Sequence, residues 1–382
     1  MQYLFIERAI SSFFNDTVKP NKVLILLGAR RVGKTAFLKK YLQNKKKSKY
    51  LLLNGEDQST IDLLEERSIS NYKRVFNNIE LLIIDEAQKI DEIGLKLKLI
   101  VDEIQGLKVI ATGSSVFDLN NQLGEPLVGR SSIIHLYPLA QMEFSPYENY
   151  KQTTEKLEER LIYGAYPELE QTPNWNEKAT YLESLVSAYL LKDILAFEGI
   201  KKADKIMDLL RLIAFQIGKE VSVDELAKNL KNISRNTVEN YLDLLSKVFI
   251  IYKVNGFSRN LRKEITKSNR WYFYDNGIRN AVIRNFNNLK FRNDIGQLWE
   301  NYLMSERIKY NHYHRKRINT YFWRTYDQQE IDLIEEENQL LNAYEFKWNE
   351  HKKVKAPKAW QNNYKEASFE VINKKNYLNF IS

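Results

Sequence analysis

The sequence contains no cysteine, four histidines, and only 14 glycines and 7 prolines in 382 residues. Without cysteine the chain can form neither disulfides nor thiolate zinc sites, and it has no cysteine nucleophile. Four histidines leave little for a dedicated zinc centre, so a catalytic metal is expected to be a hard cation held by carboxylates. His312 and His314 lie in a basic stretch and are expected to belong to a solvated loop.

The sequence also lacks a long apolar run, since none approaches the roughly 20 residues that cross a bilayer. Residues 1–10 carry Glu7 and Arg8 in an amphipathic pattern and show no secretory cleavage signature. We therefore expect no membrane association and a cytoplasmic protein. The length predicts two to four domains.

The net charge of +9 is unevenly distributed along the chain. Residues 201–382 hold 33 Lys and Arg against 22 Asp and Glu, a net of +11, so residues 1–200 carry −2. A basic half indicates a polyanionic partner such as DNA, because binding neutralises phosphates and releases counterions. The alternative is compositional, since the whole sequence is rich in Lys, Asn and Ile.

Five short apolar runs alternate with helix-patterned segments in the first part of the chain. The runs are residues 23–27, 50–53, 81–84, 109–112 and 133–136. This alternation predicts an α/β fold with a parallel sheet covered on both faces, a three-layer αβα core. We assign residues 1–140 to this core and residues 141–205, which have helical spacing, to a helical lid.

Residues 28–35 match the phosphate-loop (Walker A) pattern G-x-x-x-x-G-K-[ST] and lie between a predicted strand and a predicted helix. Backbone N–H groups of such a loop surround phosphates at a helix N-terminus. Lys34 is expected to contact the β- and γ-phosphates of ATP, and the Thr35 hydroxyl is expected to contact Mg²⁺. The nucleotide contacts are assigned to Gly28, Ala29, Arg30, Arg31, Val32, Gly33, Lys34 and Thr35.

Two carboxylates follow the third apolar run, at Asp85 and Glu86. The carboxyl ends of parallel strands meet at the edge where ligands bind. We expect Asp85 to hold Mg²⁺ through water and Glu86 to orient and deprotonate the attacking water. After the fourth run, a hydroxyl of Thr112, Ser114 or Ser115 is expected to sense the γ-phosphate.

Three helices are predicted at residues 208–214, 223–230 and 235–248, the last two at helix-turn-helix spacing. A basic stretch from Arg259 to Arg270 follows, and we assign residues 206–270 to a winged-helix-like domain. The candidates for contact with a DNA groove are Arg235, Asn236 and Asn240. The alternative is a module that contacts protein.

The last hundred residues contain a predicted helix at 294–307 followed by strands at 320–324, 330–334 and 341–348. Residues two apart in a strand share a face, so Glu345 and Lys347 project together, and a hairpin brings Asp332 beside them. The alternative is an ordinary amphipathic hairpin with a cross-strand ion pair.

Together, several motifs resemble the prokaryotic AAA+-type P-loop ATPases of the AAA/archaeal-type superfamily that carry a C-terminal PD-(D/E)XK nuclease-like domain. One departure is Asn276 after Asp275, where the family often has Thr. The motifs are residues 28–35, 85–88, 111–115, 127–130, 138–139, 163–167, 189–193 and 272–277.

The resemblance implies a restriction-endonuclease-like domain at residues 271–382. In it, Asp332 and Glu345 would bind Mg²⁺, Glu300 would be an auxiliary metal ligand, and Lys347 would activate water or stabilise the phosphate. It also implies Arg130 as an arginine sensor, in cis or in trans, and a homo-oligomer as a possible assembly.

The sequence thus predicts a Mg²⁺-dependent ATPase coupled to a DNA-directed C-terminal half with possible deoxyribonuclease activity. The catalytic residues are expected to be Glu86, Lys34, Arg130, Asp332, Glu345 and Lys347. One alternative is a nucleotide-dependent switch whose nuclease-like domain only binds DNA or protein. The other is a regulator that reads DNA through the winged helix.

Overall fold

The computed structural model describes residues 5–45, 49–114, 127–190, 203–231, 233–258, 269–352 and 354–382. By contacts the chain divides into two compact units. The N-terminal unit comprises residues 7–137 with 247–249, and the C-terminal unit comprises the remaining described residues. Ser115, most of the 189–193 motif and the basic residues between Arg259 and Lys267 lie outside the described ranges.

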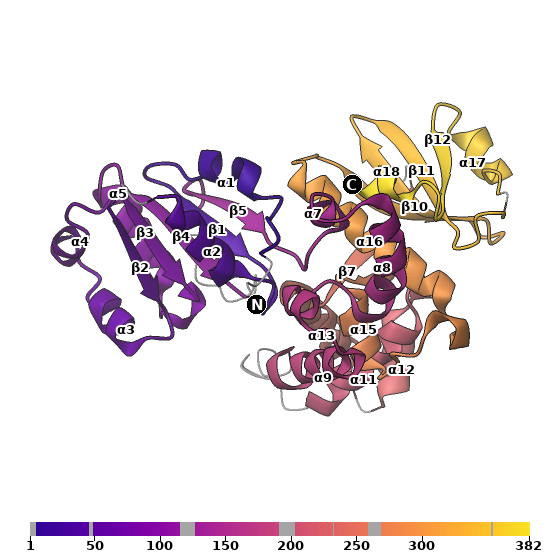
Figure 1. The fold of residues 1–382 in the computed structure, drawn as a ribbon, viewed down its shortest axis with the longest axis horizontal. Coiled ribbons are helices and arrows are strands. Elements are labelled where there is room, and N and C mark those ends of the chain that lie inside the picture. Colours follow the sequence, from indigo (N-terminus) through magenta and orange to yellow (C-terminus); the bar gives the residue numbers. More distant parts are fainter. Residues whose placement is uncertain are drawn as a thin grey trace. The chain divides into compact units, whose positions relative to one another are not determined.

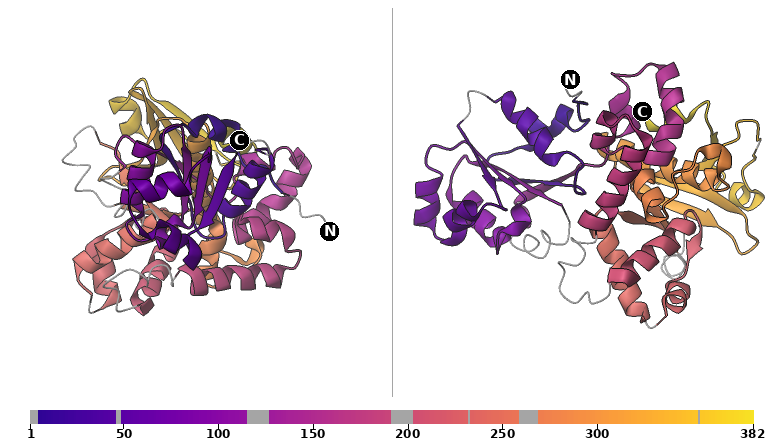
Figure 2. Two further views of the ribbon diagram at one scale, coloured as in Figure 1. Left: turned by 90° about the vertical axis from the view of Figure 1, so that its left-hand side faces the viewer. Right: turned by 60° about the horizontal axis from the view of Figure 1, so that its bottom comes forward.

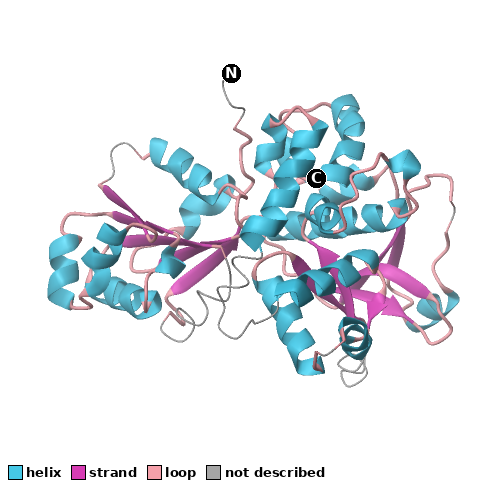
Figure 3. Ribbon diagram, turned by 90° about the horizontal axis from the view of Figure 1, so that it is seen from below, coloured by secondary structure: helices cyan, strands magenta, loops and turns pink. Residues whose placement is uncertain are grey.

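The N-terminal unit contains a five-stranded parallel sheet in the order β2-β3-β4-β1-β5. Figure 3 shows helices on both faces of this sheet, which confirms the predicted α/β fold with a parallel central sheet. The strands are β1 (Val23–Leu27), β2 (Tyr50–Asn54), β3 (Leu81–Asp85), β4 (Lys108–Gly113) and β5 (Ser131–His135). The helices labelled in Figure 1 are α1 (Ser11–Thr17), α2 (Lys34–Gln43), α3 (Gln58–Glu65), α4 (Ile69–Val75) and α5 (Ile93–Glu103), and the short helix η1 (Ala87–Lys89) precedes α5.

Apolar runs form the centre of this sheet because its strands are covered from both sides. Every residue of β1 and of β3 is buried, and both strands read as nearly continuous aliphatic sequence. Asp85 is the one charged residue in these two strands and stands at the carboxyl end of β3. The sheet therefore delivers a carboxylate to the edge from which the phosphate loop leaves β1.

The C-terminal unit begins with helices, and its first long helix, α8, ends at Tyr163 before the turn predicted at residues 163–167. The predicted three-helix pattern is present as α11, α12 and α13. The helical segments are α7 (Gln141–Phe144), α8 (Tyr150–Tyr163), η2 (Pro167–Gln171), α9 (Trp175–Ser184), η3 (Leu185–Leu190), α11 (Ala203–Phe215), α12 (Val223–Leu230), α13 (Arg235–Lys247), α15 (Asn276–Val282), η4 (Leu289–Phe291), α16 (Ile295–Tyr313), α17 (Lys358–Asn363) and α18 (Tyr377–Ile381). His312 lies in the last turn of α16 and is partly buried, so it does not belong to a solvated loop.

Seven strands of the C-terminal unit form one sheet in the order β12-β11-β10-β9-β7-β8-β6, coloured from rose to yellow in Figure 2. β7 pairs in parallel with β9 at Asn255 and Tyr321, which joins the strands beside the three-helix segment to the last strands of the chain. The expected boundary between residues 270 and 271 falls inside β8, so the sheet continues across it. The strands are β6 (Glu220–Val221), β7 (Ile251–Gly256), β8 (Asn269–Phe273), β9 (Asn319–Arg324), β10 (Glu330–Glu337), β11 (Leu340–Phe346) and β12 (Ser368–Ile372).

In the part of the chain that the structure describes, no helix is both long enough and apolar enough to cross a membrane.

Candidate functional site

The phosphate loop lies between β1 and α2, as the pattern predicts. α2 begins at Lys34, and its N-cap Gly33 has a left-handed backbone with φ 95°, which favours glycine. A Cβ on Gly28 would stand 2.1 Å from the carbonyl oxygen of Leu136, so a larger residue cannot take its place. Lys34 is buried, and its Nζ donates to the carbonyl oxygens of Gly28 (2.8 Å) and Ala29 (3.1 Å). The loop is therefore a closed turn with its lysine directed inward.

A chain of hydrogen bonds links the loop to the acidic end of β3. The Thr35 hydroxyl donates to Oδ2 of Asp85 at 2.7 Å, and the Thr112 hydroxyl donates to Oδ1 of the same carboxylate. Thr112 is fully buried at the end of β4, which lies between β1 and β3. Its Oγ1 also accepts from the backbone N–H of Glu86 at 3.0 Å. Two sequence-predicted hydroxyls, those of Thr35 and Thr112, thus converge on the carboxylate of Asp85.

Glu86 has a left-handed backbone, with φ 51° and ψ 42°, directly after β3. This conformation is costly for a residue with a Cβ and is found where a side chain must be aimed. The Gln88 side-chain amide donates to Glu86 Oε2 at 2.6 Å and to the Ser114 hydroxyl at 3.2 Å. Gln88 Oε1 is buried without a hydrogen-bond partner among the described residues. The Gln88 side chain therefore connects Ser114 to Glu86 by hydrogen bonds.

Arg8 is a positioning residue that the sequence did not reveal. Its guanidinium is buried and donates to the carbonyl oxygens of Val32 in the phosphate loop (2.7 Å) and of Tyr137 after β5 (2.6 Å). These bonds fix the loop to the exit of an adjacent strand. The amphipathic pattern of residues 1–10 gave no signal for this role, because the partners are backbone atoms far away in sequence.

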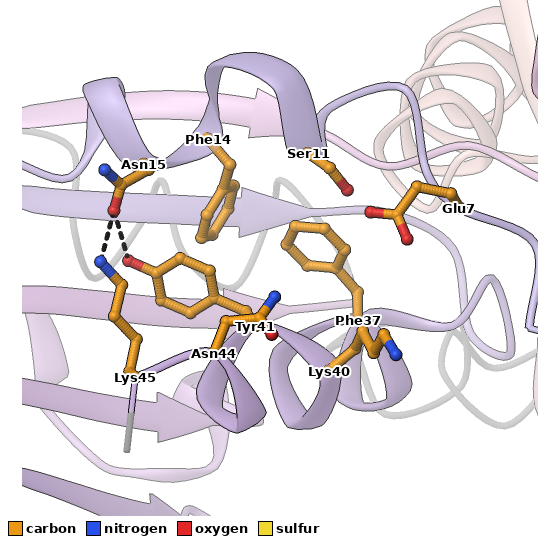
Figure 4. A pocket seen from close by; sticks show the side chains of 9 residues that line it. All are labelled: Glu7, Ser11, Phe14, Asn15, Phe37, Lys40, Tyr41, Asn44 and Lys45. Atoms are coloured by element: carbon orange, nitrogen blue, oxygen red, sulfur yellow. Dashed lines mark hydrogen bonds between the residues drawn. The ribbon is translucent and has the colours of Figure 1, made fainter. Parts of the chain in front are cut away.

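A small cavity between α1 and α2, about 260 Å³, shows how the helix after the loop is held (Figure 4). The Phe14 ring meets the rings of Phe37 (4.7 Å between centroids) and Tyr41 (5.1 Å). Asn15 Oδ1 accepts from the Tyr41 hydroxyl at 3.3 Å and from Lys45 Nζ at 2.7 Å. These aromatic contacts brace α2 and so the position of its first residue, Lys34.

Arg130 is not brought to this site within the chain. It precedes β5, and its carbonyl accepts from the N–H of Val23 at the first residue of β1. Because β1 and β5 are parallel, Arg130 lies at the edge of the sheet opposite to the phosphate loop. Its Nε bonds Asp102 at 2.7 Å, and this pairing raises the pKa of Arg130. An action in cis does not fit this placement.

In the C-terminal unit, a bulge in β10 places Asp332. The pairing of β10 with β9 shifts by one residue between Ile331 and Ile334, and such a bulge redirects side chains. Asp332 is buried, and its Oδ2 accepts from the backbone N–H of Phe346 on β11 at 2.8 Å. Burial raises the pKa of Asp332, partly offset by that hydrogen bond and by Lys347.

Glu345 and Lys347 lie next to Asp332, as the hairpin pattern predicts. Lys347 Nζ forms an ion pair with Glu345 Oε1, while Glu345 Oε2 is buried without a hydrogen-bond partner among the described residues. Burial and the Asp332 charge raise the pKa of Glu345 to about 7, although Lys347 opposes the shift. Burial lowers the pKa of Lys347, but its bond to Glu345 and the nearby carboxylates raise it overall. A carboxylate with an unused oxygen is therefore held beside a second carboxylate.

Glu300 on α16 joins this cluster through residues that the sequence reading did not assign to it. The Tyr272 hydroxyl donates to Glu300 Oε1 at 2.7 Å. Arg270 Nη1 lies 3.8 Å from Glu300 and 3.7 Å from Asp332, and Arg270 Nη2 bonds Glu330 at 2.8 Å. Burial and the charge of Asp332 raise the pKa of Glu300 to about 8. Arg270, only 2% exposed, belongs to this cluster and not to a solvent-facing basic wing.

No group of three His, Cys, Asp or Glu side chains in the described ranges is arranged to hold a metal ion by itself. Mg²⁺ commonly binds through one or two carboxylates and completes its shell with water and substrate phosphate. Asp332 and Glu345, with the free oxygen of Glu345, fit that kind of site. Thr35 and Asp85, whose oxygens lie 2.7 Å apart beside the loop, fit it as well.

Two carboxylates flank Arg235, the first residue of α13. Arg235 at the start of α13 forms ion pairs with Asp224 (3.4 Å) and with Glu239 (3.0 Å). Asn236 and Asn240 lie on the same helix. These pairs offset the charge that Arg235 would offer to a phosphate backbone.

Three family models match separate parts of the chain. Residues 20–145 match an AAA domain, residues 154–289 match a domain of unknown function (DUF8612), and residues 295–379 match another domain of unknown function (DUF4143). The first match covers the phosphate loop, Asp85, Glu86 and Thr112. It supports a P-loop ATPase in this part of the chain.

Two relatives extend over most of the sequence. An uncharacterized protein of Methanocaldococcus jannaschii is 25% identical over 374 residues, covering 93% of this chain and 82% of that protein. An uncharacterized protein of Haemophilus influenzae is 25% identical over 294 residues, covering 71% and 70% respectively. Both alignments are long enough to span more than the AAA domain.

Two solved structures show a weak similarity to this chain. AMPPCP-bound DnaA from Aquifex aeolicus matches with a TM-score of 0.28 and 16% identity, over 60% of this chain and 82% of that one. Drosophila ORC bound to DNA matches with a TM-score of 0.26 and 14% identity, over 74% and 95%. Such values are too low to transfer an activity. The AAA-domain match and the parallel sheet together support nucleotide-dependent activity in the N-terminal part of the chain.

Proposed function

We propose that this chain is a Mg²⁺-dependent ATPase whose hydrolytic site is the edge of the sheet formed by the ends of β1, β3 and β4. The observation that carries the proposal is the hydrogen-bonded series from Thr35 through Asp85 and Thr112 to the N–H of Glu86. It connects the residues that would hold the phosphates, the metal and the water.

Each side chain has a distinct task in this proposal. Lys34 exchanges its two backbone carbonyl acceptors for the β- and γ-phosphate oxygens, whose negative charge it offsets. The Thr35 hydroxyl and the Asp85 carboxylate hold Mg²⁺, which supplies charge neutralisation at the phosphates. Glu86 orients a water for in-line attack and accepts its proton. Gln88 and Ser114 fix the Glu86 carboxylate, and Arg8 fixes the loop.

Two variants test the assignment. Lys34→Ala should abolish binding of ATP, measured by calorimetry with Mg²⁺, because a buried phosphate charge loses its counter-charge. Glu86→Gln should still bind ATP but lower turnover by about 10²–10⁴-fold, the usual contribution of a general base. Unchanged turnover in Glu86→Gln would show that another group activates the water.

A second activity is proposed for the C-terminal unit, namely Mg²⁺-dependent cleavage of DNA at the cluster of Asp332, Glu345 and Lys347. The buried, unpartnered Glu345 Oε2 favours a metal there, because a bare buried oxygen costs free energy unless a cation or donor meets it. Lys347 would then stabilise the negative charge that develops on the phosphate.

Cleavage is tested in Mg²⁺, with and without ATP, on plasmid DNA, linear duplex DNA and single-stranded DNA. Wild type should cut, whereas Asp332→Asn and Glu345→Gln should lose the activity and Lys347→Ala should lower it by at least about 10²-fold. If wild type cuts no form of DNA in any nucleotide state, the C-terminal unit is a binding module under the control of the ATPase. That result would leave the ATPase proposal intact.

Sequence-specific reading of DNA through α13 is less well supported. The ion pairs of Arg235 with Asp224 and Glu239 place carboxylates where a recognition helix meets phosphates. We therefore expect DNA binding that weakens steeply as salt rises, since it depends on the backbone charge.

A further inference from the structure

A groove in the C-terminal unit lies next to the carboxylate cluster, and five of its eleven lining residues are aromatic. It has a volume of about 460 Å³ and lies where the end of β9 faces the end of β7 and the segment after α17. Volumes of roughly 300–1,000 Å³ are typical of sites for small ligands. Its aromatic residues are Phe257, Phe322, Trp323, Tyr326 and Tyr364.

The floor of the groove rests on packed rings. Phe257 meets Tyr364 edge to face at 5.5 Å, and Trp360 lies beneath with centroids 4.3 Å from Tyr364 and 5.3 Å from Trp323. Tyr326 is different, since it is 96% exposed. Its hairpin turn is fixed by hydrogen bonds from Thr325 N–H to the Gln329 carbonyl (2.9 Å) and from Gln328 N–H to the Thr325 carbonyl (3.1 Å). An ordered turn therefore holds an aromatic ring out beside an aromatic floor.

The groove suits a neutral ring better than a phosphate. Arg324 is the cation in its lining, and its Nη1 is 3.4 Å from Glu220, another lining residue, so its charge is offset. Gln328 and Asn363 also line the groove. Gln328 Oε1 accepts from Arg324, and Asn363 Nδ2 donates to the carbonyl oxygen of Ala359 at 2.8 Å, so a base edge would replace these bonds. Amides are the groups that bond the edges of nucleobases, and aromatic rings are the surfaces on which unpaired bases stack.

The groove and the carboxylate cluster are close together. Phe322 is a lining residue of the groove, and its buried ring lies 4.5 Å from the guanidinium of Arg270, whose Nη1 is 3.7 Å from Asp332. In addition, Arg324 is the strand partner of Glu330, which bonds Arg270. One residue, Phe322, and one guanidinium, that of Arg270, thus connect the lining of the groove with a proposed metal ligand. A nucleotide in the groove would have its neighbouring phosphate near the cluster.

We infer that the groove binds an unpaired base of a single-stranded nucleic acid, and that the substrate of the C-terminal unit is therefore single-stranded or carries a single-stranded end. This inference rests on the proposed nucleic-acid function of that unit. The net charge of +11 over residues 201–382 supplies the attraction for the strand, and the groove supplies the selection against a fully paired duplex.

The test measures the affinity of the full-length protein for a short fluorescein-labelled single-stranded oligonucleotide and for the blunt duplex of the same sequence. Fluorescence anisotropy with EDTA keeps the measurement independent of cleavage. The single strand should bind more tightly than the duplex. Tyr326→Ala should weaken binding of the single strand by about 5- to 150-fold, which corresponds to the loss of one stacked base. Tyr326→Phe should keep the affinity, because stacking needs only the ring.

The matched control is Phe291→Ala, which removes an exposed ring of the same unit (74% exposed) that does not line the groove. It should bind as wild type does. Equal affinity of Tyr326→Ala and wild type for the single strand, or equal loss with the single strand and the blunt duplex, overturns the inference. A wild type that cuts nothing but binds single strands through Tyr326 removes the cleavage proposal and keeps the groove. If wild type cleaves DNA and Tyr326→Ala cleaves it equally well, the cleavage proposal stands and the inference about the groove is wrong.

Discussion

Gly164 lies against the carboxylate of Asp275 so closely that a Cβ on the glycine would stand 2.0 Å from Asp275 Oδ1. The carboxylate accepts from the N–H of Ala165 at 2.8 Å and from the N–H of Ile278 at 3.2 Å, so it caps α15 and holds the turn after α8. Two motifs more than a hundred residues apart in sequence, at 163–167 and 272–277, are one structural lock. Burial raises the pKa of Asp275, which is otherwise lowered by Lys309 and by these backbone donors.

The lock predicts that Gly164→Ala is strongly destabilising. The position combines φ 73° with ψ −154°, a region nearly restricted to glycine, with a direct clash against Asp275. We expect a loss of about 2–5 kcal/mol in the free energy of unfolding, the sum expected from backbone strain and overpacking. Urea unfolding followed by circular dichroism measures it. Gly296→Ala is the control, because open space surrounds that site at the start of α16, and it should be neutral or slightly stabilising.

The Thr112 hydroxyl is predicted to act through Asp85 and Glu86, not on the nucleotide alone. Thr112→Val keeps the shape of the side chain but removes both the donor to Asp85 and the acceptor for the Glu86 N–H. Losses of about 10- to 100-fold in activity or metal affinity are typical when such a supporting bond is removed. Steady-state ATPase assays over a Mg²⁺ titration should show this loss in Thr112→Val but not in Thr112→Ser. Identical Mg²⁺ dependence in wild type and Thr112→Val would contradict the prediction.

The sequence predicted which residues lie together at the proposed nucleotide site, because they belong to local motifs at the ends of buried strands. Lys34, Thr35 and Asp85 follow apolar runs and Thr112 ends one, and parallel pairing brings those ends together. The role of Arg8 was not predicted, because its partners are backbone carbonyl oxygens, which every residue type carries. The placement of Arg130 follows from its position before β5, since a residue that precedes a strand of a parallel sheet lies at the edge opposite to the loops that follow the strands. An action of Arg130 in trans stays a prediction.

The C-terminal cluster was predicted in part. The two-residue period of β11 and its hairpin with β10 identified Asp332, Glu345 and Lys347. Arg270 was predicted to belong to a basic, exposed stretch. The sequence does not show that Arg270 on β8 is buried beside Glu300 and Asp332. The pairing of β7 with β9 was also invisible, since it joins segments far apart in the chain through two residue pairs.

The raised pKa values in the carboxylate cluster predict a pH-dependent stability. Glu300, with a pKa of about 8, keeps its proton in the folded chain between its ordinary value near 4.5 and pH 8, whereas the unfolded chain releases it. The free energy of unfolding should therefore fall as pH rises through this window, by up to about 1.4 kcal/mol per pH unit for each proton involved. Urea midpoints measured in the presence of EDTA should therefore decline from pH 6 to pH 8.

Glu300→Gln separates this contribution from the rest of the protein. The amide keeps the size of the side chain and can still accept from the Tyr272 hydroxyl, but it has no proton to lose in this range. The variant should show a flatter decline of the urea midpoint with pH than wild type. A slope equal to that of wild type would mean that Glu300 ionises at its ordinary value in the folded chain.

The placement of Arg130 predicts that its removal leaves the turnover of a single chain unchanged. It lies before β5, and the five residues of that strand, at about 3.3 Å each, separate it from the edge with the phosphate loop. In dilute protein, Arg130→Ala should keep the ATPase rate within about twofold of wild type, because removing a half-exposed ion pair with Asp102 has a small effect on stability. Asp102→Ala, which breaks the same pair but keeps the arginine, is the control.

If wild-type turnover per chain rises with protein concentration, Arg130→Ala should remove that rise, as expected of an arginine that reaches the site of a second copy. If Arg130→Ala loses turnover in dilute protein and Asp102→Ala does not, then Arg130 acts at the site of its own chain and the prediction is wrong.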